Sequence, residues 1–215
     1  MTITAIEPQV RHPERRSIFL DGEFAMGVDA EVIARTGLRV GQELTFAELQ
    51  ELARVEERRA ARDAALTLLG HRDRSARELE RRLLRKGFEP EVVAEVIEQL
   101  ERRELVDDRR FARTWVQGHT GSRPYGPDRL AAALRARGVD REAIAEAVAA
   151  IDPETEAALA LRAGRKLVEG LRPPYNPEAR RKLAAALRRR GYSWEVIRPV
   201  CEQLLGDESV DEEGE

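Results

Sequence analysis

Apolar positions along most of the chain recur every three or four residues, which is the period of an amphipathic helix. In the clearest segment, Leu79 and Leu83 fall on one face of a first helix, and a second apolar stripe runs from Val92 to Leu100. Gly87 stands between the two stripes and can adopt the positive φ that ends a helix. The pattern therefore predicts two helices joined by a tight turn.

The same helix–turn–helix pattern occurs three times without a gap, in residues 78–100, 129–151 and 182–204. The turn glycines Gly87, Gly138 and Gly191 align, and they stand 51 and 53 residues apart. That spacing suits a unit of three helices rather than two. The predicted fold class is all-α, with three tandem three-helix repeats stacked into a curved, elongated rod.

The first part of the chain has a different period. Alternating apolar residues flank the dipeptide Asp21-Gly22, a strong hairpin signal, so we predict a β-hairpin over 17–28. A two-stranded hairpin is marginal alone, so we expect it to pack on a following helix. Asp29 is positioned to cap a short helix, and a capping box at Thr45 opens another. A hairpin module of this kind could cap the rod or bind a partner.

Breaks in these patterns divide the chain into six predicted parts. The last nine residues hold six acidic side chains, which is typical of a disordered tail. The parts are a flexible arm (1–16), the β-hairpin with short helices (17–55), repeat one (56–105), repeat two (106–151), repeat three (152–206) and the acidic tail (207–215).

Composition and cysteine content indicate a cellular location. Hydrophobic residues make up 42% of the 215 residues and charged residues 36%, so the helices can bury a core under a densely charged surface. No apolar run reaches the ~18 residues that span a bilayer, and the N-terminus lacks the apolar centre of a signal peptide. A single cysteine cannot form an internal disulfide. We therefore expect a cytoplasmic protein without membrane contact.

The sequence contains no catalytic or metal-binding constellation. The three histidines stand in the arm and at helix ends, without a second ligand at a zinc-site spacing. Cys201 aligns with the buried stripe of its repeat and is expected in the core. We predict no catalytic residue, no metal and no cofactor.

Basic residues are the more informative signal. Only three of the 37 are lysine, and arginine favours bidentate contacts with phosphate or carboxylate, although a GC-rich genome would produce the same bias. The equivalent residues Lys86, Arg137 and Arg190 directly precede the turn glycines, where a cation also complements the helix dipole.

Further arginines gather in repeats one and three, whereas repeat two has alanines at several equivalent places. This uneven charge favours an anionic partner, either nucleic acid or an acidic groove on another protein. The candidate partner- and DNA-binding residues are Arg72, Arg74, Arg77, Arg81, Arg82, Arg85, Lys86, Arg137, Arg188, Arg189 and Arg190. Tyr125 and Tyr175, each beside Arg and Pro, can either stack on bases or fill the joints between repeats.

Three phrases between about residue 60 and residue 204 are distinctive: RDRSARELERRLLRKGF, VIEQLERRELVDDRRFARTWV and GPDRLAAALRARGV. Together they resemble the RecX family of bacterial recombination regulators. The resemblance implies a non-enzymatic negative regulator of RecA, the ATP-driven recombinase that coats single-stranded DNA. It implies binding in the groove of the RecA–DNA filament and inhibition of ATP hydrolysis, strand exchange and LexA co-cleavage, and hence regulation of DNA repair and the SOS response. Weak, sequence-independent binding to single-stranded and double-stranded DNA by a monomer belongs to the same expectation.

Two other function classes stay open. A sequence-specific repressor would use helix-turn-helix units, but the third helices, PEVVAEVIEQL and REAIAEAVAAI, are acidic where they would meet phosphates. A protein-interaction scaffold would follow if the arginines are only compositional.

Overall fold

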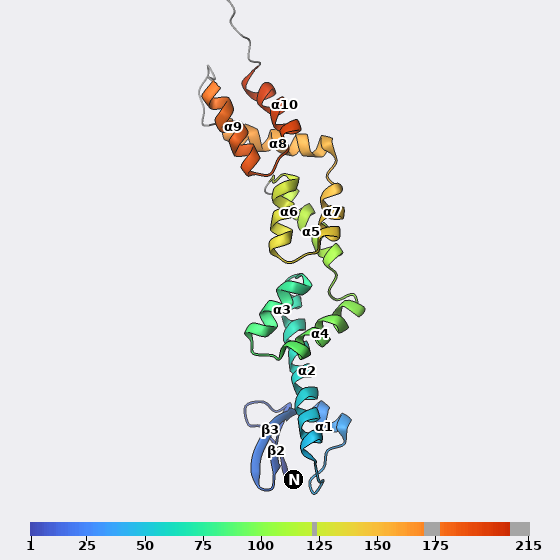
Figure 1. Ribbon diagram of the computed structural model, residues 1–215. Helices are drawn as coiled ribbons and strands as arrows, with labels where there is room; N and C mark the ends of the chain where they lie inside the picture. The colour runs from blue at the N-terminus through green and yellow to red at the C-terminus, as the bar shows by residue number, and fades with distance from the viewer. Residues whose placement is uncertain (122–123, 170–176, 207–215) are drawn as a thin grey trace, which may run out of the picture. The chain divides into compact units, whose positions relative to one another are not determined.

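The computed structural model describes residues 1–121, 124–169 and 177–206, in which a small antiparallel sheet is followed by ten helices (Figure 1). The predicted class, helical repeats behind a small N-terminal β module, is confirmed. The rod shape stays a prediction. The proposed tail and the loop that contains Tyr175 lie outside the described residues.

The N-terminal sheet has three strands rather than two. They are β1 (Ile3–Pro8), β2 (Arg15–Leu20) and β3 (Glu23–Asp29), in the order β1-β2-β3. The hairpin between β2 and β3 is confirmed, and its turn residues Asp21 and Gly22 both have positive φ. The prediction of a flexible arm over 1–16 is wrong, because β1 pairs with β2 and buries Ile3 completely. A register shift between Ile3 and Ala5 interrupts the alternation that would have marked this strand.

The sheet packs on helices, as its marginal size requires. Helix α1 (Ala30–Thr36) begins at Asp29, whose side chain accepts a hydrogen bond from the Glu31 amide. Helix α2 (Phe46–His71) begins at the predicted capping box of Thr45 and Glu48. The predicted boundary at 55/56 falls inside α2, so one continuous helix supports the sheet and also enters the first repeat.

The chain divides into two compact units. The first contains Met1–Asp73 and Leu79–Leu105, and so joins the β module to most of the first repeat. There α4 (Pro90–Arg102) packs along α2, and its apolar stripe is buried. The residues of helix α3 (Ala76–Arg85) are shared between the two units. Arg74–Glu78 belong to the second unit, together with the chain from Val106 onward.

The second unit contains the other two repeats, each with its own core. Repeat two consists of α5 (Asp108–Gly121), α6 (Pro127–Ala136) and α7 (Arg141–Ala149). Repeat three consists of α8 (Pro153–Val168), α9 (Pro177–Arg189) and α10 (Trp194–Leu205). Ile151 packs against both cores and links them.

The turn after each middle helix is the same in all three repeats. Gly87, Gly138 and Gly191 have φ of 90°, 81° and 86°. The amide of the following residue donates back to a leucine carbonyl in each helix, at 3.4 Å in the first repeat and 3.3 Å in the second. This is the Schellman arrangement that requires a left-handed residue, so the glycines are where the sequence predicted them.

Candidate functional site

The exposed face of α3 and the turn after it carry three exposed residues of the predicted binding set. Arg81 and Arg85 lie one helical turn apart and are exposed, and Lys86 follows them at the start of the turn. Within the described chain, none of these three side chains forms an ion pair or a hydrogen bond. Their charges are therefore available to an outside anion. Arg82, on the same helix, is half-buried.

The residues before α3 have a structural role. Arg74 is 7% exposed and Ser75 is fully buried. The Ser75 hydroxyl accepts from the Glu78 amide at 3.2 Å and donates to the Arg137 carbonyl at 2.6 Å. Arg72 is exposed and donates to the neighbouring Asp73 carbonyl at 2.7 Å.

The start of α3 docks on the turn after α6, within the second unit. The Ala76 amide donates to the Asp108 carboxylate at 2.9 Å. A Cβ on Gly138 would lie 2.4 Å from both Cβ and Cγ of Arg77, so the turn and the Arg77 stem are in direct contact. Burial of the Asp108 carboxyl raises its pKa, and the hydrogen bond from Ala76 opposes that rise. Arg77 therefore belongs to a joint between repeats as well as to the predicted binding residues.

The start of α6 docks on the turn after α9 in the equivalent way. The Gly126 amide donates to the Arg190 carbonyl at 2.8 Å, and the Asp128 amide donates to the Gly191 carbonyl at 3.1 Å. A Cβ on Gly126 would lie 2.3 Å from the Gly191 oxygen. The Arg188 guanidinium pairs with the Asp128 carboxylate at 2.7 Å. The two joints thus use the same pair of repeat positions.

Arg137 and Arg190 use their side chains inside the molecule. The Arg137 guanidinium lies 4.7 Å from the centre of the Trp115 ring and donates to the Ala133 carbonyl at 2.8 Å. Trp115 also stacks on His119, with ring centres 3.6 Å apart. The Arg190 side chain donates to the Ala186 carbonyl at 3.4 Å. Both cations stabilise helix C-termini, whereas the equivalent Lys86 is exposed.

Two tyrosines near the second joint contribute to its packing. Tyr125 is half-buried against the core of repeat two, and the Arg129 guanidinium lies 4.5 Å from its ring centre. Tyr192, which the sequence analysis did not single out, is fully buried and donates its hydroxyl to the Pro124 carbonyl at 2.7 Å. Burial strongly raises its pKa. The Tyr125 contacts agree with the joint-filling alternative.

Of the remaining predicted binding residues, Arg189 is exposed at the end of α9, and its carbonyl accepts a hydrogen bond from the Arg129 side chain at 3.2 Å. Cys201 is 3% exposed in the core of repeat three, as expected, and burial raises the pKa of its thiol.

In the described ranges, His, Cys, Asp and Glu side chains form no group of three or more that could hold a metal ion. No helix in that part of the chain is long and apolar enough to cross a membrane.

Family models match the chain in four segments. Residues 1–45 match the model described as "Regulatory protein RecX N-terminal domain". The first, second and third three-helix domains of RecX match residues 61–100, 107–148 and 154–201. The β module is therefore part of the family pattern, and the three repeats correspond to three family domains.

Individual relatives agree with the family models. The chain is 33% identical to "Regulatory protein RecX" of Bacillus subtilis (strain 168) over 213 residues, which cover 99% of this chain and 81% of the relative. It is 28% identical to the protein of the same name from Clostridioides difficile (strain 630), over 97% of this chain and 98% of the relative.

Solved structures show the same fold. A "Crystal structure of regulatory protein RecX" aligns with a TM-score of 0.76 and 25% identity, over 96% of this chain and 99% of that one. RecX from Lactobacillus salivarius aligns with a TM-score of 0.65 and 19% identity, over 70% of this chain and 97% of that one. The resemblance seen in the sequence is confirmed: the chain belongs to the RecX family of regulatory proteins.

Proposed function

We propose that this protein is a non-enzymatic negative regulator of RecA. It binds as a monomer in the groove of the RecA–DNA filament in the cytoplasm and inhibits ATP hydrolysis, strand exchange and LexA co-cleavage, and thereby the SOS response. The observation that carries this proposal is the family match over all four segments of the chain.

The contact surface that we propose is the exposed face of α3 with its following turn. Arg81, Arg85 and Lys86 are exposed and form no ion pair in the described chain, so an anionic partner would not have to displace an internal one. Exposed Arg189 extends the candidate set into repeat three. Arg74 is set aside because it is buried, and Arg137 because it is engaged with Trp115.

The same cations would give weak, sequence-independent DNA binding. Arginines on a helix surface neutralise phosphates without reading base edges, so this binding should fall steeply as salt rises. Both single-stranded and double-stranded DNA offer that backbone.

Sequence-specific repression is the less favoured function. The exposed residues of α4 include Glu91 and Glu98, and those of α7 include Glu142 and Glu146. A third helix with this surface would place carboxylates against the phosphates that flank the major groove. The basic residues lie on the middle helices instead.

The decisive experiment measures RecA ATP hydrolysis on single-stranded DNA, with substoichiometric protein added to preformed filaments. We compare wild type with R81A/R85A/K86A and with the control R11A/R39A/R141A. The control removes the same charge from exposed arginines that form no ion pair in the described chain. The α3 variant should require about tenfold more protein for the same inhibition, because it lacks three charged contacts.

Each outcome has a defined meaning. Loss of inhibition in the α3 variant alone supports both the function and the surface. Equal inhibition by all three proteins keeps the function and overturns the surface. Absence of inhibition by wild type, across protein ratios and salt concentrations, overturns the regulator and leaves the scaffold or the repressor.

A further inference from the structure

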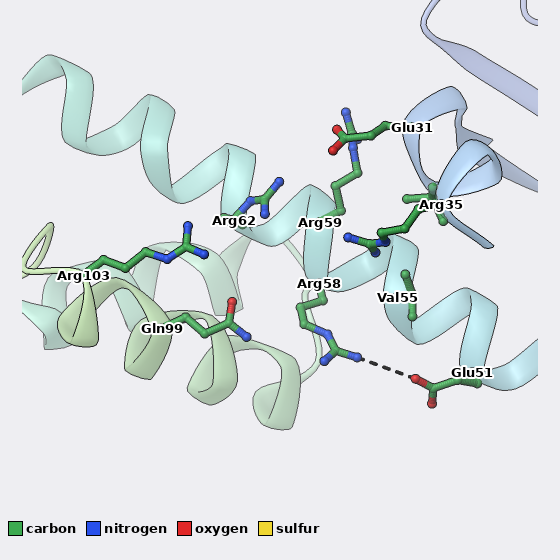
Figure 2. A pocket seen from close by; sticks show the side chains of 10 residues that line it. Glu31, Arg35, Glu51, Val55, Arg58, Arg59, Arg62, Gln99 and Arg103 are labelled. Atoms are coloured by element: carbon green, nitrogen blue, oxygen red, sulfur yellow. Dashed lines mark ion pairs between the residues drawn. The ribbon is translucent and has the colours of Figure 1, made fainter. Parts of the chain in front are cut away.

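A cavity of about 420 Å³ opens in the first unit beside α1, α2 and α4, and none of the predicted binding residues lines it. Its size lies within the usual range for small-ligand sites. Five of its ten lining residues are arginines, and they come from three parts of the fold (Figure 2). They are Arg35 of α1, Arg58, Arg59 and Arg62 of α2, and Arg103 directly after α4.

Two of these arginines each pair with two carboxylates. Arg58 pairs with Glu51 at 3.7 Å and with Glu95 at 3.3 Å. Arg59 pairs with buried Asp29 and with Asp63. A guanidinium carries five N–H donors, so such pairs orient it and leave donors unused. The Arg59 Nε is buried and has no hydrogen-bond partner in the described structure.

Of the other three arginines, Arg35 and Arg103 leave positive charge uncompensated. Arg35 and Arg103 form no ion pair in the described ranges, and the nearest carboxylate recorded for Arg62 is Asp63 at 3.8 Å. Figure 2 shows Arg35 reaching from α1 and Arg103 from α4 toward the part of α2 that carries Arg62. Of the two glutamates in the lining, Glu51 is paired with Arg58, which leaves Glu31 against the two unpaired cations, Arg35 and Arg103. The cavity therefore has an excess of about one positive charge, which favours an anionic ligand.

The direction of the donors distinguishes phosphate from carboxylate. A carboxylate is planar, and a single arginine can satisfy it by two parallel bonds. The arginines here come from α1, from α2 and from the residue after α4, so several guanidinium groups line the cavity, which suits the oxygens of a tetrahedral phosphoryl group. Val32 and Val55 give part of the cavity wall an apolar surface, and the side-chain amide of Gln99 can donate and accept hydrogen bonds. This leaves a surface for an organic group attached to the phosphate.

From these contacts we infer that the cavity is a binding site for the phosphate monoester of a nucleotide, either free or at the 5′ end of a DNA strand. The inference does not depend on the RecA proposal, since it concerns a different surface of the chain. A protein that fails to inhibit RecA would still bind the ligand here.

The test is calorimetric titration of the full chain with AMP, with a 5′-phosphorylated oligonucleotide and with the same oligonucleotide bearing a 5′-hydroxyl. A glutamate-rich peptide is the carboxylate probe. The site variant is R35A/R103A, and the matched control is R11A/R39A, which removes the same charge from exposed residues of the same unit. All four residues are exposed, and thermal unfolding by circular dichroism verifies that both variants are folded.

We expect the site variant to bind the phosphate-monoester probe at least about tenfold more weakly than wild type and the control, because two charge-assisted contacts are lost. Binding of AMP supports a free nucleotide as the source, and binding of the 5′-phosphorylated strand in preference to the 5′-hydroxyl strand supports a DNA end. Three results would overturn the inference: equal weakening in the control, no binding of either phosphate-monoester probe by wild type, or site-dependent binding of the peptide without binding of phosphate.

Discussion

The turns after α3 and after α9 have the same backbone and opposite surroundings. Gly87 and Gly191 have φ of 90° and 86°, and each follows a basic residue at the end of a middle helix. A Cβ on Gly87 would meet no atom within 4 Å, whereas one on Gly191 would lie 2.3 Å from the Arg129 amide nitrogen. The first turn is open in the described chain, and the last is a docking surface for the start of α6.

The comparison shows that the two turns require glycine for different reasons, and that the cation before each glycine has a different role. In both turns glycine meets the need for a positive φ, but only at Gly191 must the side chain also be absent to let another backbone approach. The cation before the open turn, Lys86, is exposed, whereas Arg190 is partly buried and donates to a carbonyl of its own helix. The open turn is therefore where the chain can offer charge to a partner.

The strongest test of the comparison is Gly191→Ala. We expect a loss of about 3 kcal/mol of unfolding free energy, since left-handed strain adds to a clash with a backbone that cannot rotate away. Urea unfolding followed by tryptophan fluorescence measures it, because Trp115 and Trp194 both lie in the second unit. A loss of 1 kcal/mol or less would show that the joint can open without cost.

Ser75→Ala tests the first joint. The buried hydroxyl bonds to the Arg137 carbonyl and to the Glu78 amide, and alanine replaces neither bond. A loss of about 2 kcal/mol is expected by the same fluorescence measurement. Ser75→Gly, which also lacks the hydroxyl, is the companion variant, and wild-type stability in both would contradict a role for this hydroxyl in the joint.

Gly87→Ala is the matched control for Gly191→Ala. The φ is nearly the same but the space around it is empty, so only backbone strain remains, about 1 kcal/mol. Circular dichroism is the suitable probe, since the first unit contains no tryptophan. Equal losses for Gly87→Ala and Gly191→Ala would remove the distinction between the two turns.

The smallest effect is expected from Asp108→Asn. Burial raises the pKa of this carboxyl, so the folded state binds its proton more tightly than the unfolded chain. Wild-type stability from this group is therefore greatest at low pH and declines as pH rises above the ordinary value of 3.8. Asparagine keeps an acceptor for the Ala76 amide and removes the charge.

The Asp108→Asn variant should exceed wild type by about 0.5 kcal/mol at pH 7, and the difference should shrink toward pH 4. Parallel urea titrations at the two pH values measure it. Asp108→Ala, which loses the acceptor, should be less stable than wild type at both. A constant difference between Asp108→Asn and wild type would show that ionisation of Asp108 does not matter.

Several features could be predicted from the sequence because they are local. The turn glycines, the capping box at Thr45, and the first-turn prolines Pro90 and Pro127 depend on residues within one helical turn of each other. The sequence analysis failed to predict strand β1, and this failure also has a local cause. Its register shift hides the alternation, and only pairing with β2 reveals the strand.

The candidate surface could be predicted only in outline. The sequence analysis treated its eleven candidate basic residues alike, but burial removes Arg74 from solvent and Trp115 engages Arg137. The partners of these side chains lie far away in the chain, as with Arg188 and Asp128, which are 60 residues apart. Periodicity within one helix contains no information about such a partner.

By itself, the sequence determined the helical repeats, their left-handed glycine turns and a chain rich in arginine, because short-range sterics and hydrogen bonding decide these features. The tertiary structure alone decided which cations remain free on α3, which are used in the joints, and that Arg35, Arg62 and Arg103 surround one cavity. The physical reason is that exposure and electrostatic compensation depend on neighbours brought together by packing of distant helices.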